Sequence, residues 1–443
     1  MRIVTLLVII VIYAIPLQAQ AMVTAASCSR ADVGVAVTAA NYGDTVSVPA
    51  CTSTTWGSTL TITKGIKLRG AGAGATKIVS GVAAGRFLLV YTPDTTSISS
   101  NTPIEISDFT FDMNNNDSGG IWINNTSGTT PITRVNIHNN TFQNMSSNGS
   151  STDVVCLRLG TNGDAWGVAY LNTFTNCNVV GNNYGGFASS WNNTTYVYGS
   201  QNNFYWEDNT FTGNSAFHYG GWGGRYVARF NTYQFTTGDY QVVWDVHGNQ
   251  PGGVYGTMGC EIYRNTVSLA RGTTIFDHRG GSCMFFQNTL TGTDGSWQIR
   301  EEYDDSIDPT SNPQPQHVSN TYYFLNTLNG SNHAMSETQD CCAAIAANVQ
   351  YWNFTASFTG ATGVGSGTLT ARPATCTTGV GYWATDQGTW NTLGTDGLFY
   401  KCTSANTWSL YYTPLTYPHP LRSGAGQTTD TTPPAAPANV AVF

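Results

Sequence analysis

A short triplet, Asn-Thr followed by a large apolar residue, recurs through this chain and constrains its fold more than any other feature. Successive asparagines of the triplet are 32, 37, 22, 34, 23 and 38 residues apart. A minimum step with irregular longer ones fits a parallel β-helix, in which one coil takes roughly twenty residues and insertions form loops. The seven triplets begin at Asn140, Asn172, Asn209, Asn231, Asn265, Asn288 and Asn326, and Asp108-Phe109-Thr110-Phe111 looks like a variant at the front.

The chemistry of asparagine explains why it would be repeated in this frame. Asparagine tolerates the left-handed backbone conformation of a tight turn, where its side chain can bond the local backbone. Coils stack about 4.8 Å apart, so side-chain amides of successive turns can also bond one another, while the apolar residue two positions later points inward. The alternative is chance in a chain rich in Asn and Thr, which seven copies disfavour. The pattern predicts an all-β, single-stranded parallel β-helix.

Low charge limits what the protein can bind. Charged residues make up 10% of the 443-residue chain, against roughly a quarter in ordinary globular chains. The net charge is −8, with 18 Lys plus Arg and no basic run. Phosphate neutralisation needs clustered cations, so nucleic acid and anionic membrane surfaces are disfavoured as partners.

The first 21 residues have the pattern of a secretory signal peptide. Arg2 precedes an apolar run from Ile3 to Ile15, which is short for a membrane span, and Ala19-Gln20-Ala21 fits a cleavage site. An uncleaved anchor is the alternative. We expect a secreted bacterial protein, extracellular or periplasmic, with no membrane association after cleavage, and a monomer.

Ten cysteines, an even number, suit an oxidising compartment. Two pairs bracket short segments and are expected to be local disulfides, Cys28 with Cys51 and Cys376 with Cys402. Cys260 and Cys283 each lie five residues before a triplet asparagine, so they should occupy one position on neighbouring coils, either as free thiols or as a disulfide. The sequence suggests no pairing for Cys341 and Cys342.

These segments together resemble the right-handed parallel β-helix proteins of the pectate-lyase-like superfamily, found among secreted bacterial proteins. Cys28 to Cys51 is similar to their N-terminal cap, a short amphipathic helix before the first strand, and Leu60 to Gly72 is similar to their first coils. The resemblance covers roughly residues 28–422. It implies the fold but not the activity, because the superfamily holds lyases, hydrolases, esterases, tailspikes and proteins without known catalysis.

The resulting domain plan has five parts. We expect a signal peptide (1–21), an N-terminal cap (22–59), the β-helix (60–335), last coils with a disulfide-stapled cap segment (336–422) and a Pro/Thr/Ala-rich linker or tail (423–443). In the cap segment, Trp383 and Trp390 would either form a carbohydrate-binding face or close the end of the helix. Glu261, beside the cysteine column, is expected to be exposed.

Four segments between the triplets, 216–221, 243–248, 275–280 and 299–304, align by their apolar residues and by the bend that follows. Their inward residues would be Phe217, Trp244, Phe276 and Ile299. Alternation along a strand then predicts one outward column and the next. The first column would hold His218, Asp245, Asp277 and Arg300, and the second His247, Arg279 and Glu302. Mutual pairing of these charges is the alternative to a functional site.

Three functions compete for this patch, with the enzymatic ones drawn from the resemblance. The first is a polysaccharide lyase that cleaves a uronate-containing glycan by β-elimination. Asp245, Asp277 and Glu302 would hold Ca²⁺. Arg279 or Arg300 would stabilise the enolate or take the C5 proton, with His247 as the alternative base.

The second function is a glycoside hydrolase using Asp245 and Asp277, held about 5 Å apart as in retaining enzymes. The third is a non-catalytic carbohydrate-binding or adhesive protein, in which the patch pairs internally. We expect the lyase first, with an extracellular polysaccharide as partner. The candidates for substrate binding are His218, Trp222, Arg225 and His278.

Overall fold

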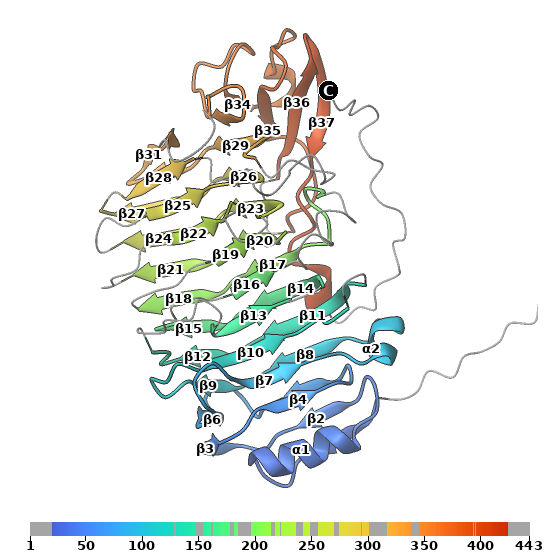
Figure 1. Cartoon of the computed structure of the whole chain (residues 1–443). Helices are drawn as coiled ribbons and strands as arrows, with labels where there is room; N and C mark the ends of the chain where they lie inside the picture. The colour runs from blue at the N-terminus through green and yellow to red at the C-terminus, as the bar shows by residue number, and fades with distance from the viewer. Residues whose placement is uncertain are drawn as a thin grey trace, which may run out of the picture.

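Three long parallel sheets dominate the computed structural model (Figure 1). The structure describes residues 20–127, 130–146, 154–160, 163–177, 181–184, 196–213, 218–221, 223–235, 242–248, 256–269, 274–293, 295–300, 317–337, 345–392, 394 and 396–423. Within these residues the protein is nearly all β, as the sequence predicts.

The twelve-stranded sheet runs in the order β1 (Met22–Thr24), β2 (Thr45–Ser47), β5 (Lys67–Arg69), β8 (Ile104–Ser107), β11 (Ile132–His138), β14 (Ala165–Tyr170), β17 (Phe204–Glu207), β20 (Arg225–Arg229), β23 (Gly259–Tyr263), β26 (Ser282–Phe286), β29 (Thr321–Phe324), β33 (Tyr351–Asn353). The eleven-stranded sheet comprises β3 (Cys51–Trp56), β6 (Thr76–Ser80), β9 (Thr110–Asp112), β12 (Thr141–Gln143), β15 (Thr173–Thr175), β18 (Thr210–Gly213), β21 (Thr232–Phe235), β24 (Thr266–Leu269), β27 (Thr289–Gly292), β30 (Thr327–Leu328) and β31 (Ser331–Asn332), of which the last pairs antiparallel.

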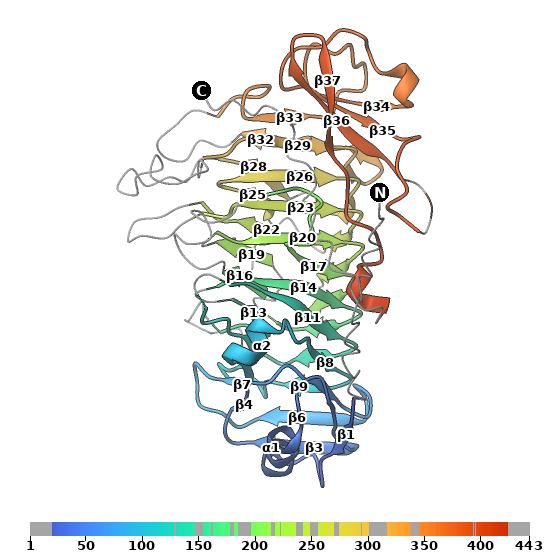
Figure 2. The same ribbon diagram turned by 90° about the vertical axis from the view of Figure 1, so that its right-hand side faces the viewer.

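The ten-stranded sheet comprises β4 (Leu60–Ile62), β7 (Phe87–Tyr91), β10 (Gly119–Ile123), β13 (Leu157–Leu159), β16 (Gly181–Tyr184), β19 (His218–Gly221), β22 (Val242–Val246), β25 (Thr274–His278), β28 (Ser296–Ile299) and β32 (Ser336–Glu337). Neighbours within each sheet are three elements apart along most of the chain, so the chain visits the three sheets in turn. This order, visible as stacked layers in Figure 2, is consistent with a β-helix solenoid.

The N-terminal end is closed by the predicted helix, α1 (Arg30–Ala39), which lies beside the first strands (Figure 1). The Ser29 side chain accepts a bond from the Asp32 N–H at 3.1 Å and so caps the helix. Val33, Ala36 and Val37 form its buried face. A second short helix, α2 (Thr95–Ser99), begins at Asp94, whose carboxylate caps it in the same way.

The triplet asparagines form the predicted ladder at the corner between the twelve- and eleven-stranded sheets. Each amide Nδ2 donates to the Oδ1 of the next asparagine at 2.9–3.2 Å, without interruption from Asn140 to Asn326. The same Nδ2 also donates to a backbone carbonyl of the preceding coil, as Asn140 does to Ile106. The variant at the front fits as well, because Phe109 takes the ladder position and its N–H donates to Asn140.

One detail of the predicted corner is wrong. The left-handed residue is not the ladder asparagine but the residue before it, for example Leu171 with φ 53° and Phe230 with φ 58°. The ladder asparagine has no side-chain bond left for its own backbone, since its amide is committed to the neighbouring coils. The bonded amides hold the turn, so residues without Asn's tolerance for this conformation still adopt it.

Rings stack inside the solenoid on the apolar position of the triplet, as predicted. Consecutive ring centroids are 5.4, 4.9, 4.8 and 4.6 Å apart along the column Phe111, Phe142, Phe174, Phe211, Tyr233. Aliphatic residues continue the same register at Val267, Leu290 and Leu328. The column belongs to one continuous core, which runs the length of the sheets.

Both predicted local disulfides are present, Cys28–Cys51 and Cys376–Cys402. Cys260 and Cys283 are paired in register and bonded, which decides between the two alternatives left by the sequence. A fourth disulfide, Cys156–Cys177, was not predicted, because its partners lie outside the triplet frame. Cys341 and Cys342 lie outside the described residues.

A second hydrophobic core covers the outer face of the twelve-stranded sheet. Its C-terminal part is a small sheet of β34 (Val364–Gly367), β35 (Gly381–Ala384), β36 (Leu398–Ser404) and β37 (Thr407–Tyr412), with short 3₁₀ turns at Leu369–Ala371 and Pro420–Ser423. Trp383 and Trp390 are buried in this core against the rings of Phe286 and Tyr263, so they cover the outer face of the sheet and do not form a sugar-binding face. After β37, a strap of residues 413–423 descends along the sheet (Figure 2).

The remaining features bear on the cell compartment. Within the described ranges, no helix is long and apolar enough to cross a membrane. The four disulfides are compatible with an extracellular or periplasmic location. Most of the predicted signal peptide, residues 1–19, lies outside the described residues, as does nearly all of the predicted tail.

Candidate functional site

The predicted patch lies on the outer face of the ten-stranded sheet, where its central register is confirmed. Trp244 pairs with Phe276 in the core, and Asp245 pairs with Asp277 on the outer face. The two flanking segments are shifted from the prediction. His218 pairs with Trp244, so Tyr219 and not His218 is in line with Asp245.

The other flank is shifted by two residues. Gln298 pairs with Asp277 and Ile299 with His278, which puts Arg300 one column beyond the two aspartates. The apolar pattern predicted the inward face of Ile299 correctly, because a register shift of two residues preserves the alternation of side chains. It left the pairing partner undetermined.

Two arginines bind the two aspartates in an alternating ladder, Asp245–Arg279–Asp277–Arg300. Arg279 Nη2 donates to both oxygens of Asp245 at 2.7 Å, and its Nε lies 3.4 Å from Asp277. Arg300 donates from Nε and Nη2 to the two Asp277 oxygens at 3.0 and 2.8 Å. We name these four residues the Asp–Arg ladder. Arg300 therefore reaches the patch through its length, although its backbone lies beyond it.

The aspartates of the Asp–Arg ladder are almost inaccessible to solvent. Asp245 and Asp277 are 6% and 4% exposed, and Arg279 is 8% exposed. Burial raises the pKa of Asp245 above its ordinary value, while the charges of Arg279 and His247 oppose the rise. In ion pairs buried this deeply, the attraction between the charges mainly offsets the cost of removing them from water. Removal of one partner lowers the stability strongly, because it leaves an unpaired buried charge.

Calcium does not fit the described part of this patch. All four aspartate oxygens accept hydrogen bonds from arginine, so a cation would have to displace both guanidinium groups. Among the described residues no cluster of three metal-ligating side chains occurs. Glu302, the third predicted ligand, lies outside the described residues.

The two histidines of the patch point to opposite faces. His247 follows β22 and is buried, with its Nδ1 2.9 Å from the Gly248 carbonyl. His278 faces the core, in contact with the Tyr323 hydroxyl at 2.6 Å and the Gly280 carbonyl at 3.0 Å. Burial lowers the pKa of His278 to about 4. The placement of His278 among surface groups is therefore wrong, because it alternates with Asp277 on the strand.

The remaining substrate-binding candidates do not gather at the ladder. Arg225 lies on β20 in the twelve-stranded sheet, buried, with Asp164 3.6 Å from its Nη2. His218 is placed only by its strand register, and Trp222 lies outside the described residues. Glu261, expected at the surface, is fully buried and binds the Gly199 N–H and the Tyr412 hydroxyl, each at 2.7 Å.

Strand register extends the outer column well beyond the predicted patch. From β7 to β28 it reads Val90, Trp122, Arg158, Asn182, Tyr219, Asp245, Asp277, Gln298. Trp122 and Arg158 are partly exposed, and the Arg158 guanidinium lies 4.9 Å from the Trp122 ring centroid. The Trp122 Nε1 donates to the Gly160 carbonyl at 3.2 Å, which fixes the ring. No sequence pattern indicated this pair, since neither residue lies in one of the four aligned segments.

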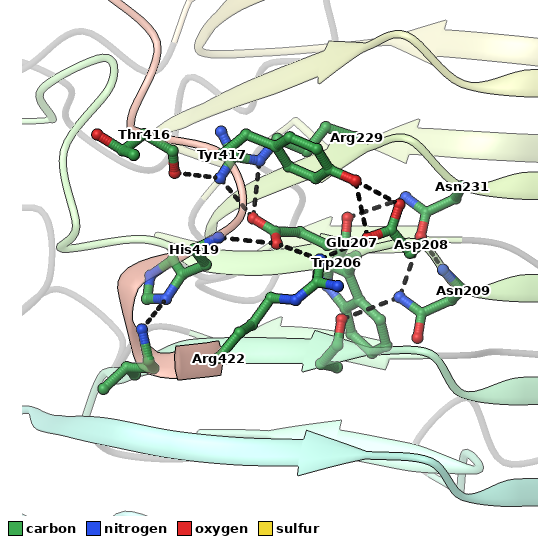
Figure 3. A network of polar contacts seen from close by, with 12 residues as sticks. Trp206, Glu207, Asp208, Asn209, Arg229, Asn231, Thr416, Tyr417, His419 and Arg422 are labelled. Carbon is green, nitrogen blue, oxygen red and sulfur yellow. Dashed lines mark hydrogen bonds and ion pairs between the residues drawn. The ribbon is translucent and has the colours of Figure 1, made fainter. Parts of the chain in front are cut away.

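A second polar network lies under the strap on the twelve-stranded sheet (Figure 3). Arg229 donates to Glu207 at 2.8 Å and to two strap carbonyls, Leu415 at 2.6 Å and Thr416 at 2.9 Å. Arg422 of the strap returns to Glu207 at 3.0 Å and also binds Asp208. Every charge of this network has an opposite partner, so we interpret it as the anchor of the strap.

Comparisons with known proteins add little. No family model and no curated protein matches the chain. Among solved structures, ORF18 of Geobacillus virus E2 matches at 15% identity with a TM-score of 0.40, over 70% of this chain. The match spans 62% of that viral chain, which is less than two thirds of its length. A likeness at this TM-score carries no argument about fold or function.

Proposed function

We propose that this protein is a secreted, right-handed parallel β-helix of the pectate-lyase-like kind that binds an extracellular, uronate-containing polysaccharide. The ligand would lie along the outer column of the ten-stranded sheet. The observation that carries the proposal is the pair of Trp122 and Arg158 in this column, where an aromatic ring and an arginine lie at the same register position on neighbouring strands.

The chemistry of the column suits an acidic sugar chain. Strands are about 4.8 Å apart, which is comparable to the length of one sugar unit, so successive coils can meet successive sugars. An indole ring packs against the apolar face of a sugar, and arginine recognises a carboxylate through its planar fork. Trp122 and Arg158 offer both groups side by side.

Binding without catalysis is favoured over the two enzymatic functions by the Asp–Arg ladder. Each aspartate that would serve as nucleophile, acid or calcium ligand already accepts bonds from arginine. A hydrolase would need those oxygens free, so the hydrolase using Asp245 and Asp277 has the least support. Internal pairing of the patch is what the non-catalytic alternative expected.

A binding assay on the purified protein tests this function. Titration calorimetry with a uronate-containing polysaccharide should show saturable heat, and Trp122→Ala should weaken the affinity about tenfold, corresponding to about 1.4 kcal/mol. Arg158→Gln should weaken binding of the acidic chain more than of a neutral chain. The matched control is Arg69→Gln, which removes an exposed arginine on the twelve-stranded sheet. Wild-type affinity in both Trp122→Ala and Arg158→Gln would contradict the proposal.

The lyase is the second candidate, supported by one observation. His247 is close enough to Asp245 for the two charges to interact, so an imidazole that could act as base lies beside the ladder. Growth of absorbance at the unsaturated-uronate band, abolished by His247→Gln with binding intact, would establish β-elimination. New reducing ends without this absorbance would indicate hydrolysis. Intact binding with neither product would support the non-catalytic function.

A further inference from the structure

A β-bulge on the outer face of the twelve-stranded sheet brings together two residues that each carry a buried donor atom with no acceptor among the described residues. Ile132 of β11 pairs with Ala165 of β14, and Val135 pairs with Gly167, so Thr133 and Arg134 together lie opposite Trp166. Such bulges re-aim side chains and are common beside functional sites. The bulge requires glycine at position 167, where a side chain would collide with the Val135 carbonyl.

Arg134 and Trp166 both point away from the core. Val135 and Ala165, their neighbours along the strands, are core residues, so alternation directs Arg134 and Trp166 to the outer face. The two residues come from adjacent strands at the same register position. Their side chains therefore leave the sheet side by side.

One donor atom of each side chain lacks a partner among the described residues. The Arg134 Nε and the Trp166 Nε1 are buried atoms with no hydrogen-bond acceptor. Trp166 as a whole is only 6% exposed. No carboxylate of the described residues pairs with Arg134, whereas the neighbouring arginine on this face, Arg225, has Asp164. A buried donor without an acceptor costs about 1–3 kcal/mol, so such groups usually meet a water or a ligand.

We propose that Arg134 and the Trp166 indole form a binding site for an oxyanion, either a free one or one carried on a glycan. The planar fork of Arg134 would bind two oxygens of a carboxylate, sulfate or phosphate, and Trp166 would donate a further hydrogen bond. This site lies on a different sheet from the outer column of the ten-stranded sheet and does not depend on the proposed function.

Titration calorimetry at low salt, with three probes on the purified protein, tests the site. The probes are inorganic sulfate, inorganic phosphate and a uronate oligosaccharide. We expect saturable binding of at least one probe, weakened about tenfold or more in Arg134→Gln and about fivefold in Trp166→Phe, which keeps the ring but removes the donor. Arg134→Lys keeps the charge without the fork and should give an intermediate affinity. Arg86→Gln is the matched control and should bind as wild type.

The three arms separate the sources of the anion. Binding of sulfate or phosphate that weakens in Arg134→Gln, with oligosaccharide binding unchanged, assigns a free anion, and oligosaccharide binding that weakens in Arg134→Gln assigns a glycan. Oligosaccharide binding that is unchanged in Arg134→Gln and Trp166→Phe, together with no Arg134-dependent binding of sulfate or phosphate, would overturn this site while leaving the proposed function intact. Failure of all three probes to bind would overturn it as well. Circular dichroism of each variant establishes that it is folded.

Discussion

Replacement of Glu261 by Gln should stabilise this protein at neutral and alkaline pH. The carboxylate lies between the twelve-stranded sheet and two segments far away in the chain, and it accepts bonds from Gly199 and Tyr412. A further contact comes from Asn203, at 3.4 Å. Glutamine can keep the Gly199 bond through its carbonyl, and its amide can donate to the Tyr412 hydroxyl, which can accept.

The magnitude follows from the pKa of the buried carboxyl. Burial raises the pKa of Glu261 from its ordinary 4.5 to about 7. The folded state therefore holds the proton more tightly than the unfolded state, so stability is lost as pH rises from about 4.5 to about 7 and is constant above that. A shift of about 2.5 units corresponds to about 3 kcal/mol at pH 8. With about 2.1 cal/mol/K per residue, the midpoint of thermal unfolding should rise by about 3–4 °C.

Thermal unfolding of wild type and Glu261→Gln between pH 4 and pH 8 measures this effect. We expect the two midpoints to converge at pH 4 and to separate above pH 6, with the variant higher. The matched control is Glu105→Gln, because Glu105 has its pKa lowered through contact with His138 and Arg69 although burial acts in the opposite direction. That variant should already be less stable than wild type at about pH 5, with no further separation from this carboxyl at higher pH, because a lowered pKa confines its titration to below about 4.5. A Glu261→Gln midpoint below wild type at pH 8, or a difference independent of pH, would refute the reasoning.

Three further substitutions test the asparagine ladder, the strap and the Asp–Arg ladder. Asn231→Ala should cost about 2–4 kcal/mol of unfolding free energy in chemical denaturation, because it leaves buried partners on both neighbouring coils unsatisfied, whereas the exposed Asn329→Ala should cost much less. Arg422→Gln should destabilise by about 3 kcal/mol and increase protease cleavage within the strap, since Glu207 loses one of its two arginine partners; unchanged cleavage would argue against an anchoring role. Arg279→Met should lower the unfolding midpoint at pH 7 and much less at pH 3, where Asp245 is protonated; an equal loss at both pH values would contradict a charge effect.

The sequence carried the part of the fold that is repeated. The asparagine triplet predicted the ladder, the ring column and the pairing position of Cys260 with Cys283, because each coil presents the same local environment to the next. Because the triplet recurs from coil to coil, the same local contacts fix the register between neighbouring coils. Where the repeat was absent, apolar alternation gave the correct face at Ile299 but not its partner, and at His218 it gave neither, since His218 is in register with the inward Trp244.

The candidate site depended on information that no local pattern holds. Asp245 and Asp277 were placed correctly as neighbours, but their commitment to arginine is a property of side chains that meet only after the coils stack. Glu261 alternates outward as a surface residue would, yet the C-terminal segment covers that face. Its burial required knowledge of where residues more than a hundred positions away return to the sheet.

Sequence alone therefore determined the coil, its asparagine corner and its inward column, because hydrogen bonding and apolar burial between neighbouring coils repeat with the chain. Tertiary structure alone decided which outward faces are surface and which are interior. The strap and the C-terminal sheet convert the outer face of the twelve-stranded sheet into a second core, where Glu207, Arg229 and Glu261 are held as buried charges. Contacts of that kind join segments with no common period, so their physical cause appears only when the chain is folded.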